Sequence, residues 1–98
     1  MSLIMENLKF VYTGIIIKES KGFSALCPEL DVASEAETII EAKHNLSEAV
    51  SLYIETAIES NLSINRAVPY EDDPRIKRQA DIVELYRLSV EMAVKVYA

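Results

Sequence analysis

The sequence predicts one α+β domain over residues 1–98, with an antiparallel β-sheet of three or four strands and one long helix packed on one face. Three observations predict this fold class. The first third of the chain is rich in β-branched and aromatic residues, the middle carries an apolar stripe at helical spacing, and the last segment alternates apolar with polar residues. The expected order is β-β-β-α-β, with a short extra helix as an option before the last strand.

The first strand is expected over residues 9–19, where β-branched and aromatic residues run between polar ends. Its apolar side chains divide between two faces, with Phe10, Tyr12 and Ile16 on one and Val11, Ile15 and Ile17 on the other. A strand that is apolar on both faces is usually covered on both. Gly14 interrupts the run and indicates a bulge or a close approach of another segment.

Two short strands should follow. The turn signal Ser20-Lys21-Gly22 precedes an expected hairpin partner at residues 23–27. Pro28 ends that strand, because proline has no N–H for the ladder. A third strand is expected over residues 30–34.

The long helix is predicted to run from Thr38 to about Ser60. Thr38 and Glu41 have the spacing of a capping box, which satisfies free N–H groups of the first helical turn. Apolar residues then recur three or four positions apart, at Ile39, Ala42, Leu46, Ala49, Val50, Tyr53 and Ala57. After a polar loop, Asp73-Pro74 fits a helix start, and residues 88–97 alternate as a half-buried strand.

Composition limits the classes of function. The formal net charge is −6, from sixteen acidic and ten basic residues, and this balance disfavours nucleic-acid binding, which depends on Lys and Arg contacts with phosphates. It suits a basic protein partner, or solubility alone. The single cysteine excludes an internal disulfide, and a reducing cytoplasm is the expected location. No apolar run approaches the ~20 residues that a membrane-spanning helix needs.

The second apolar face of the first strand predicts association. One helix can cover only one face of the sheet, so the face that carries Val11, Ile15 and Ile17 needs other cover. We expect a homo-oligomer, a dimer or a tetramer, built across this face or along the sheet edge. These three residues are the candidate interface.

Four acidic residues between the second strand and the helix are the candidate partner-binding residues: Glu29, Asp31, Glu35 and Glu37. Three interpretations stay open for this run, which Glu41 extends. It is a solvated acidic rim, a contact for a protein partner, or a Mg²⁺ site for nuclease chemistry. The spacing matches no metal-binding motif, so no metal and no cofactor are expected.

The other reactive side chains have a structural interpretation. His44 falls on the solvated side of the helix, and Cys27 ends a strand with no base beside it in sequence. The basic cluster Arg75, Lys77 and Arg78 is small for a nucleic-acid surface and is expected to be solvated. No catalytic residue is expected.

Residues 22–49 resemble the HicB-like antitoxin family. Members typically show G-[FY]-x-A-x-x-P-x-L, then T-x-x-E-A at the start of a helix, then an E-A pair. Those positions are held here by Gly22, Phe23, Ala25, Pro28, Leu30, Thr38, Glu41, Ala42, Glu48 and Ala49. Ala36-Glu37 stands where relatives usually carry Gly-Asp or Gly-Glu.

The resemblance implies a truncated ribonuclease H-like fold and a non-enzymatic role, in which the protein neutralises a small basic ribonuclease toxin (HicA) by binding it. Many relatives continue into a DNA-binding module, whereas this sequence ends at Ala98, so direct nucleic-acid binding is not expected. The alternative is a stand-alone oligomeric domain of the same fold that binds a small ligand or regulates another protein without a toxin partner.

Overall fold

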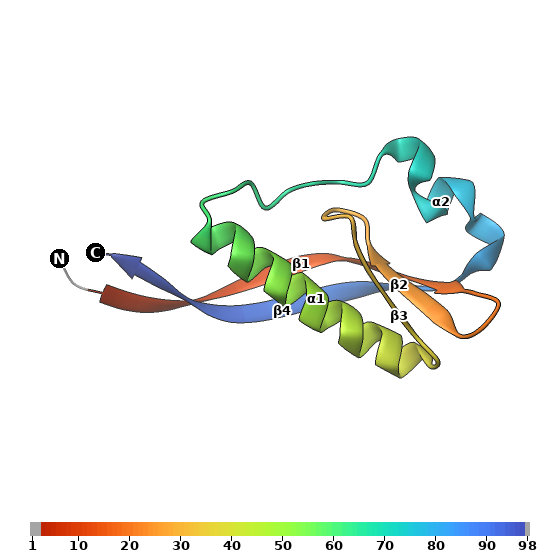
Figure 1. The fold of residues 1–98 in the computed structure, drawn as a ribbon, viewed down its shortest axis with the longest axis horizontal. Coiled ribbons are helices and arrows are strands. Elements are labelled where there is room, and N and C mark those ends of the chain that lie inside the picture. Colours follow the sequence, from red (N-terminus) through yellow and green to blue (C-terminus); the bar gives the residue numbers. More distant parts are fainter. Residues whose placement is uncertain (1–2, 98) are drawn as a thin grey trace.

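Four antiparallel strands in the order β3-β2-β1-β4 form one sheet, and α1 lies across one of its faces (Figure 1). The computed structural model describes residues 3–97. The elements are β1 (Leu3–Lys18), β2 (Phe23–Cys27), β3 (Val32–Ala36), α1 (Ile39–Glu59), η1 (Tyr70–Asp72), α2 (Pro74–Lys77), η2 (Gln79–Asp81) and β4 (Ile82–Tyr97). The predicted fold class, the β-β-β-α-β order and the short extra helix before the last strand are confirmed.

The first and last strands of the chain, β1 and β4, are longer than predicted. They pair from Leu3 with Tyr97 to Ile17 with Ile82, while β2 pairs only with residues 15–18 of β1. The remainder of the β1–β4 pair is therefore a two-stranded arm that projects from the sheet (Figure 1). One bulge interrupts the pairing after Ile16, where Val83 is the unpaired residue of β4.

The third strand begins two residues later than predicted. Residues 28–31 form the turn between β2 and β3, in which the amide of Leu30 donates to the carbonyl oxygen of Cys27. Asp31 takes a left-handed φ of 53° in this turn. The strand can start only at Val32, because the turn uses Leu30 and Asp31.

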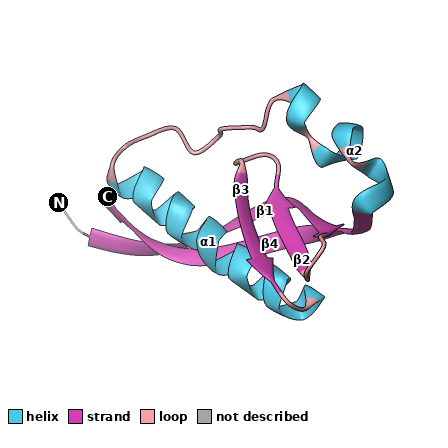
Figure 2. Cartoon of the chain, turned by 45° about the vertical axis from the view of Figure 1, so that its right-hand side comes forward, coloured by secondary structure: helices cyan, strands magenta, loops and turns pink. Residues whose placement is uncertain are grey.

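The main core lies between α1 and the sheet (Figure 2). Phe10, Tyr12 and Ile16 of β1 face the helix, as predicted. The helix begins after Thr38, whose Oγ1 accepts a hydrogen bond from the amide of Glu41 at 3.2 Å. The fully buried residues of the stripe are Ala42, Leu46, Val50 and Ile54; the sequence pattern missed Ile54.

Both glycines lie where a side chain would collide with its neighbours. A Cβ on Gly14 would lie 2.2 Å from the ring of Tyr86, the residue opposite it on β4. The close approach that Gly14 predicted is thus the approach of an aromatic ring. Gly22 has a φ of +91°, and a Cβ there would lie 2.4 Å from the carbonyl oxygen of Ala36, so the first hairpin requires glycine.

The face of the sheet away from α1 is covered in part by the chain itself. After α1, the amides of Arg66 and Val68 donate to the carbonyl oxygens of Glu29 and Pro28, at 3.3 and 2.8 Å. Further on, Arg78 pairs with Glu19, just past the end of β1. These contacts hold the segment from residue 66 to residue 81 against the chain at two places, one just after β2 and one just after β1.

This cover corrects the predicted open face. Ile15 is 0% exposed and Ile17 is 4% exposed within the single chain, and neither belongs to the core under α1. The prediction that both lie on an uncovered face is wrong, because the segment expected as a polar loop and a short helix folds back and brings Pro74 into the interior. Val11, the third candidate interface residue, remains 50% exposed.

Candidate partner-binding surface

Three of the four predicted acidic residues lie along one exposed edge of the sheet. Ser34 of the edge strand β3 donates from Oγ to the carbonyl oxygen of Ala42 in α1 at 3.0 Å, so the next side chain, Glu35, points away from the helix. Asp31 lies in the turn before β3, and Glu37 follows its last residue. All three carboxylates are exposed, and together they are the β3 acidic edge.

The backbone of this edge is partly occupied. The side-chain amide of Asn45, on α1, donates to the carbonyl oxygen of Glu35 at 3.3 Å. This contact uses an acceptor that an added strand would otherwise pair with. The β3 acidic edge therefore offers charge more than it offers an open backbone ladder.

The carboxylate of Glu29, the fourth predicted residue, forms hydrogen bonds within the chain. Both carboxylate oxygens accept from the amide of Thr13 at 3.1 Å, and Oε2 also accepts from Thr13 Oγ1 at 2.9 Å. At Thr13, β2 has already ended, and Glu29 satisfies the N–H group that β1 directs toward the missing strand. We therefore exclude Glu29 from the candidate surface.

An open hollow of about 420 Å³ lies beside this contact. Its lining joins the Glu29 carboxylate and Thr13 with exposed side chains of β1 and β4, including Val11 and Arg87. It brings one acidic and one basic side chain to the same opening.

The basic cluster is neutralised by neighbouring acids. Each member has at least one carboxylate within 4.0 Å: Arg75 with Asp73 (2.6 Å), Lys77 with Asp72 (4.0 Å), and Arg78 with Glu19 (2.8 Å) and Asp81 (3.1 Å). Hydrogen bonds from the Arg75 side chain hold the pKa of Asp73 below its usual value, although burial opposes this shift. The cluster is thus part of the fold of segment 66–81 rather than a free basic patch.

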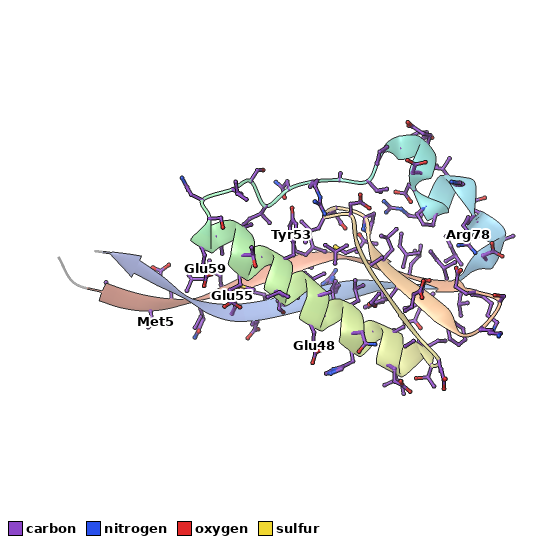
Figure 3. The ribbon with its side chains drawn as sticks, in the orientation of Figure 1. Met5, Glu48, Tyr53, Glu55, Glu59 and Arg78 are labelled. Atoms are coloured by element: carbon purple, nitrogen blue, oxygen red, sulfur yellow. The ribbon has the colours of Figure 1, made fainter. Side chains whose placement is uncertain are left out.

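α1 carries a second set of exposed acids, outside the predicted partner-binding residues: Glu48, Glu55 and Glu59 (Figure 3). Glu55 and Glu59 border a groove of about 730 Å³ between the end of the helix and the β1–β4 arm, where Ile58, Met5 and residues 92–94 supply the apolar walls. Glu55 and Glu59 lie near the C-terminal, negative end of the α1 dipole, and the last turn of the helix contains no basic residue to offset them.

The two candidate nucleophile or base residues are not arranged for catalysis. Cys27 is 0% exposed, and burial, followed by the charge of Glu29, raises the pKa of its thiol to about 11. His44 lies on the opposite, exposed side of α1 and contacts Glu48 at 3.0 Å. The structural interpretation of both residues agrees with this placement.

Among the residues that the structure describes, no group of three or more His, Cys, Asp and Glu side chains is placed to hold a metal ion. Within the same residues, no helix is long and apolar enough to cross a membrane.

Comparison with known proteins shows a likeness of fold. No family model matches the chain, and no curated protein matches it. A chain of the solved structure described as "HicA3 and HicB3 toxin-antitoxin complex" matches with a TM-score of 0.57 and 24% sequence identity, over 80% of this chain and 94% of that chain. At this level of identity the match shows that the two chains share a fold.

Proposed function

We propose that this protein is an antitoxin-like binding domain that neutralises a small basic ribonuclease toxin of the HicA type by occluding it. In this proposal the chain is one non-enzymatic domain that acts in the cytoplasm and contacts neither membrane nor nucleic acid directly. The fold likeness to a chain of a toxin–antitoxin complex supports this class of function.

The observation that carries the proposal is the distribution of charge. Lys43 and the three members of the basic cluster are engaged with acids of the same chain. The β3 acidic edge, by contrast, has no ion-pair partner among the described side chains, residues 4–94. Three unpaired carboxylates thus lie together on one exposed edge of the sheet, where they raise the rate of association with a basic protein.

Co-expression tests the proposal. The chain is produced with the short basic protein encoded beside it, captured through a tag, and assayed for inhibition of RNA cleavage by that partner. We expect a stable complex and loss of cleavage. Failure to capture the partner, or cleavage that continues in excess of this chain, contradicts an antitoxin role.

Charge reversal locates the surface. The double variant Glu35→Lys and Glu37→Lys should weaken binding about tenfold at low salt and less at high salt, because screening removes the electrostatic contribution. The matched control is a pair of reversals at exposed positions farther along α1, Glu48→Lys and Glu55→Lys, which changes the net charge equally away from the edge. Equal losses in the two double variants would indicate a general charge effect and not a site.

The second candidate function is a stand-alone oligomeric domain of the same fold that binds a small ligand. The hollow beside Glu29 favours it, because Arg87 and Glu29 reach the same opening. Thermal-shift screening with charged metabolites tests this alternative. A ligand that stabilises the wild type but not Arg87→Ala supports it, and the absence of any stabilising compound argues against it.

A further inference from the structure

The outer edge of β4 is an open strand edge with a defined hydrogen-bonding phase. The amide of Thr13 donates to Glu29, on the side of β1 away from β4, so Thr13 and its partner Arg87 form a non-hydrogen-bonded pair. The N–H and C=O groups of Arg87 therefore point outward from the sheet. By alternation, the same holds for every second residue of β4, at Leu85, Ser89, Glu91 and Ala93.

This edge carries few of the features that block pairing between strands. The stretch from Glu84 to Ala93 contains no proline and no lysine, and the bulge at Val83 lies before it. The five residues with outward backbone groups are also exposed. Among the described side chains, residues 4–94, neither Arg87 nor Glu91 has an ion-pair partner.

The charges on the edge are complementary to themselves in one register. If two copies pair antiparallel about a two-fold axis at Ser89, Arg87 of each copy lies opposite Glu91 of the other. Ser89 meets Ser89, and Leu85 meets Ala93. A shift of the axis by one residue places Arg87 opposite Ser89 or Ala93, and a shift by two places like charges opposite each other, which is destabilising.

The surroundings leave room for this partner. In the same register, residues 84–86 of the second copy lie opposite residues 92–94, which line the groove of about 730 Å³ beside Glu55 and Glu59. The end of β4 that receives the second strand is thus bordered by an open groove rather than by packed side chains.

We propose that two copies of this chain join through β4, in the register centred on Ser89, and form one continuous sheet that holds both copies of α1 on the same face. The Arg87–Glu91 pairs select the register, and the outward backbone groups supply the ladder. The occupant of the edge is a second copy, because the charge pattern is its own complement. This proposal does not depend on the antitoxin role.

Sedimentation of the purified chain over a range of concentrations tests the proposal. We expect a dimer whose dissociation constant rises about tenfold in Arg87→Glu and in Glu91→Arg, because each change places like charges opposite each other twice. The combined variant Arg87→Glu and Glu91→Arg restores the opposite charges and should restore dimerisation. Glu48→Arg, which alters the net charge as Glu91→Arg does, should leave the dimer unchanged.

Proline at the centre of the edge is a second test. Ser89→Pro removes an outward N–H group without removing a bond between β1 and β4, so the chain should stay folded by circular dichroism and become monomeric. A chain that is monomeric at all concentrations, or a dimer that neither Ser89→Pro nor the single charge reversals weaken, overturns the proposal. The same holds if the combined charge variant does not recover association.

Discussion

At the scale of single residues, several side chains complete hydrogen bonds that the strands leave open. Glu29 is the clearest example, since its carboxylate accepts the amide and the hydroxyl of Thr13 where β2 ends. A buried or half-buried N–H without an acceptor costs more free energy than the hydrogen bond itself contributes. The acidic run before α1 is therefore divided between one structural carboxylate and the three of the β3 acidic edge.

Replacement of Glu29 tests this division. Glu29→Ala leaves Thr13 without its acceptor and should lower the free energy of unfolding by about 1–2 kcal/mol. Glu35 is exposed in the same acidic run, and Glu35→Ala should change the free energy of unfolding by no more than about 0.5 kcal/mol. Urea unfolding of both variants measures the difference, and equal stability would show that the Thr13 contact contributes nothing.

We expect the ion pair of Asp73 with Arg75 to make the stability of the fold fall at low pH. The pKa of Asp73 is lowered in the folded chain by the Arg75 side chain, whereas an unfolded Asp titrates at about 3.9. Its contribution is complete above about pH 4, and it is lost as the pH falls through the lower folded pKa, because the unfolded chain takes up the proton first. Asp73 also caps α2 through the amide of Arg75.

Asp73→Asn should therefore lose about 1 kcal/mol at pH 7 and show a weaker loss of stability below pH 4 than the wild type. The neighbouring exposed residue supplies the control, because Asp72→Asn removes only a 4.0 Å contact with Lys77. Urea unfolding at a series of pH values measures both effects. An Asp73→Asn curve parallel to the wild-type curve would contradict the assignment.

At the scale of elements, α1 contributes to the stability of the fold mainly through the face that packs against the sheet. Ile54 is fully buried against the sheet, whereas Ile40 on the same helix is 81% exposed. The two residues have the same side chain and differ only in what surrounds it. Packing against the sheet, and not helix propensity, should decide the cost of truncation.

Ile54→Ala should destabilise the chain by about 3 kcal/mol, through lost burial and a cavity. Ile40→Ala should change stability by no more than about 0.5 kcal/mol, since alanine is the better helix former and little burial is lost. Thermal or urea unfolding distinguishes the two. A large loss at Ile40 would mean that its face of α1 is covered in solution, for example by another copy.

At the scale of the whole molecule, the β1–β4 arm makes the chain longer than a compact domain of its size. The Cα radius of gyration is 15.1 Å, with principal extents of 53 × 27 × 18 Å, whereas a compact chain of 100 residues has a radius of about 13 Å. The arm extends the open edges of β1 and β4 beyond the sheet and brings strand edges within reach of a partner.

Small-angle scattering should show this elongation. For Ser89→Pro, or for the wild type at a dilution where it is monomeric, we expect a radius of gyration of at least about 15 Å. A value near 13 Å would mean that the arm folds back onto the body. The measurement also separates the arm from association, because a dimer would increase both the mass and the radius.

Local patterns in the amino-acid sequence were sufficient for the elements whose signals span only a few residues. Thr38 and Glu41 are three positions apart, the hairpin turn at Gly22 needs a positive φ, and residues 88–94 alternate with period two; each was predicted and found. The acidic balance and the solvated side of α1 also follow from sequence alone. Sequence placed these features because the interactions that specify them connect close neighbours.

Tertiary structure alone decided the pairings between distant residues. Thr13 and Glu29 are sixteen positions apart, and Glu19 and Arg78 are fifty-nine. These contacts took Glu29 out of the exposed acidic run, neutralised Arg78 and helped to place segment 66–81 where Ile15 and Ile17 become buried. No periodicity encodes which loop returns to which strand, because that choice depends on the free energy of burial summed over the whole folded chain.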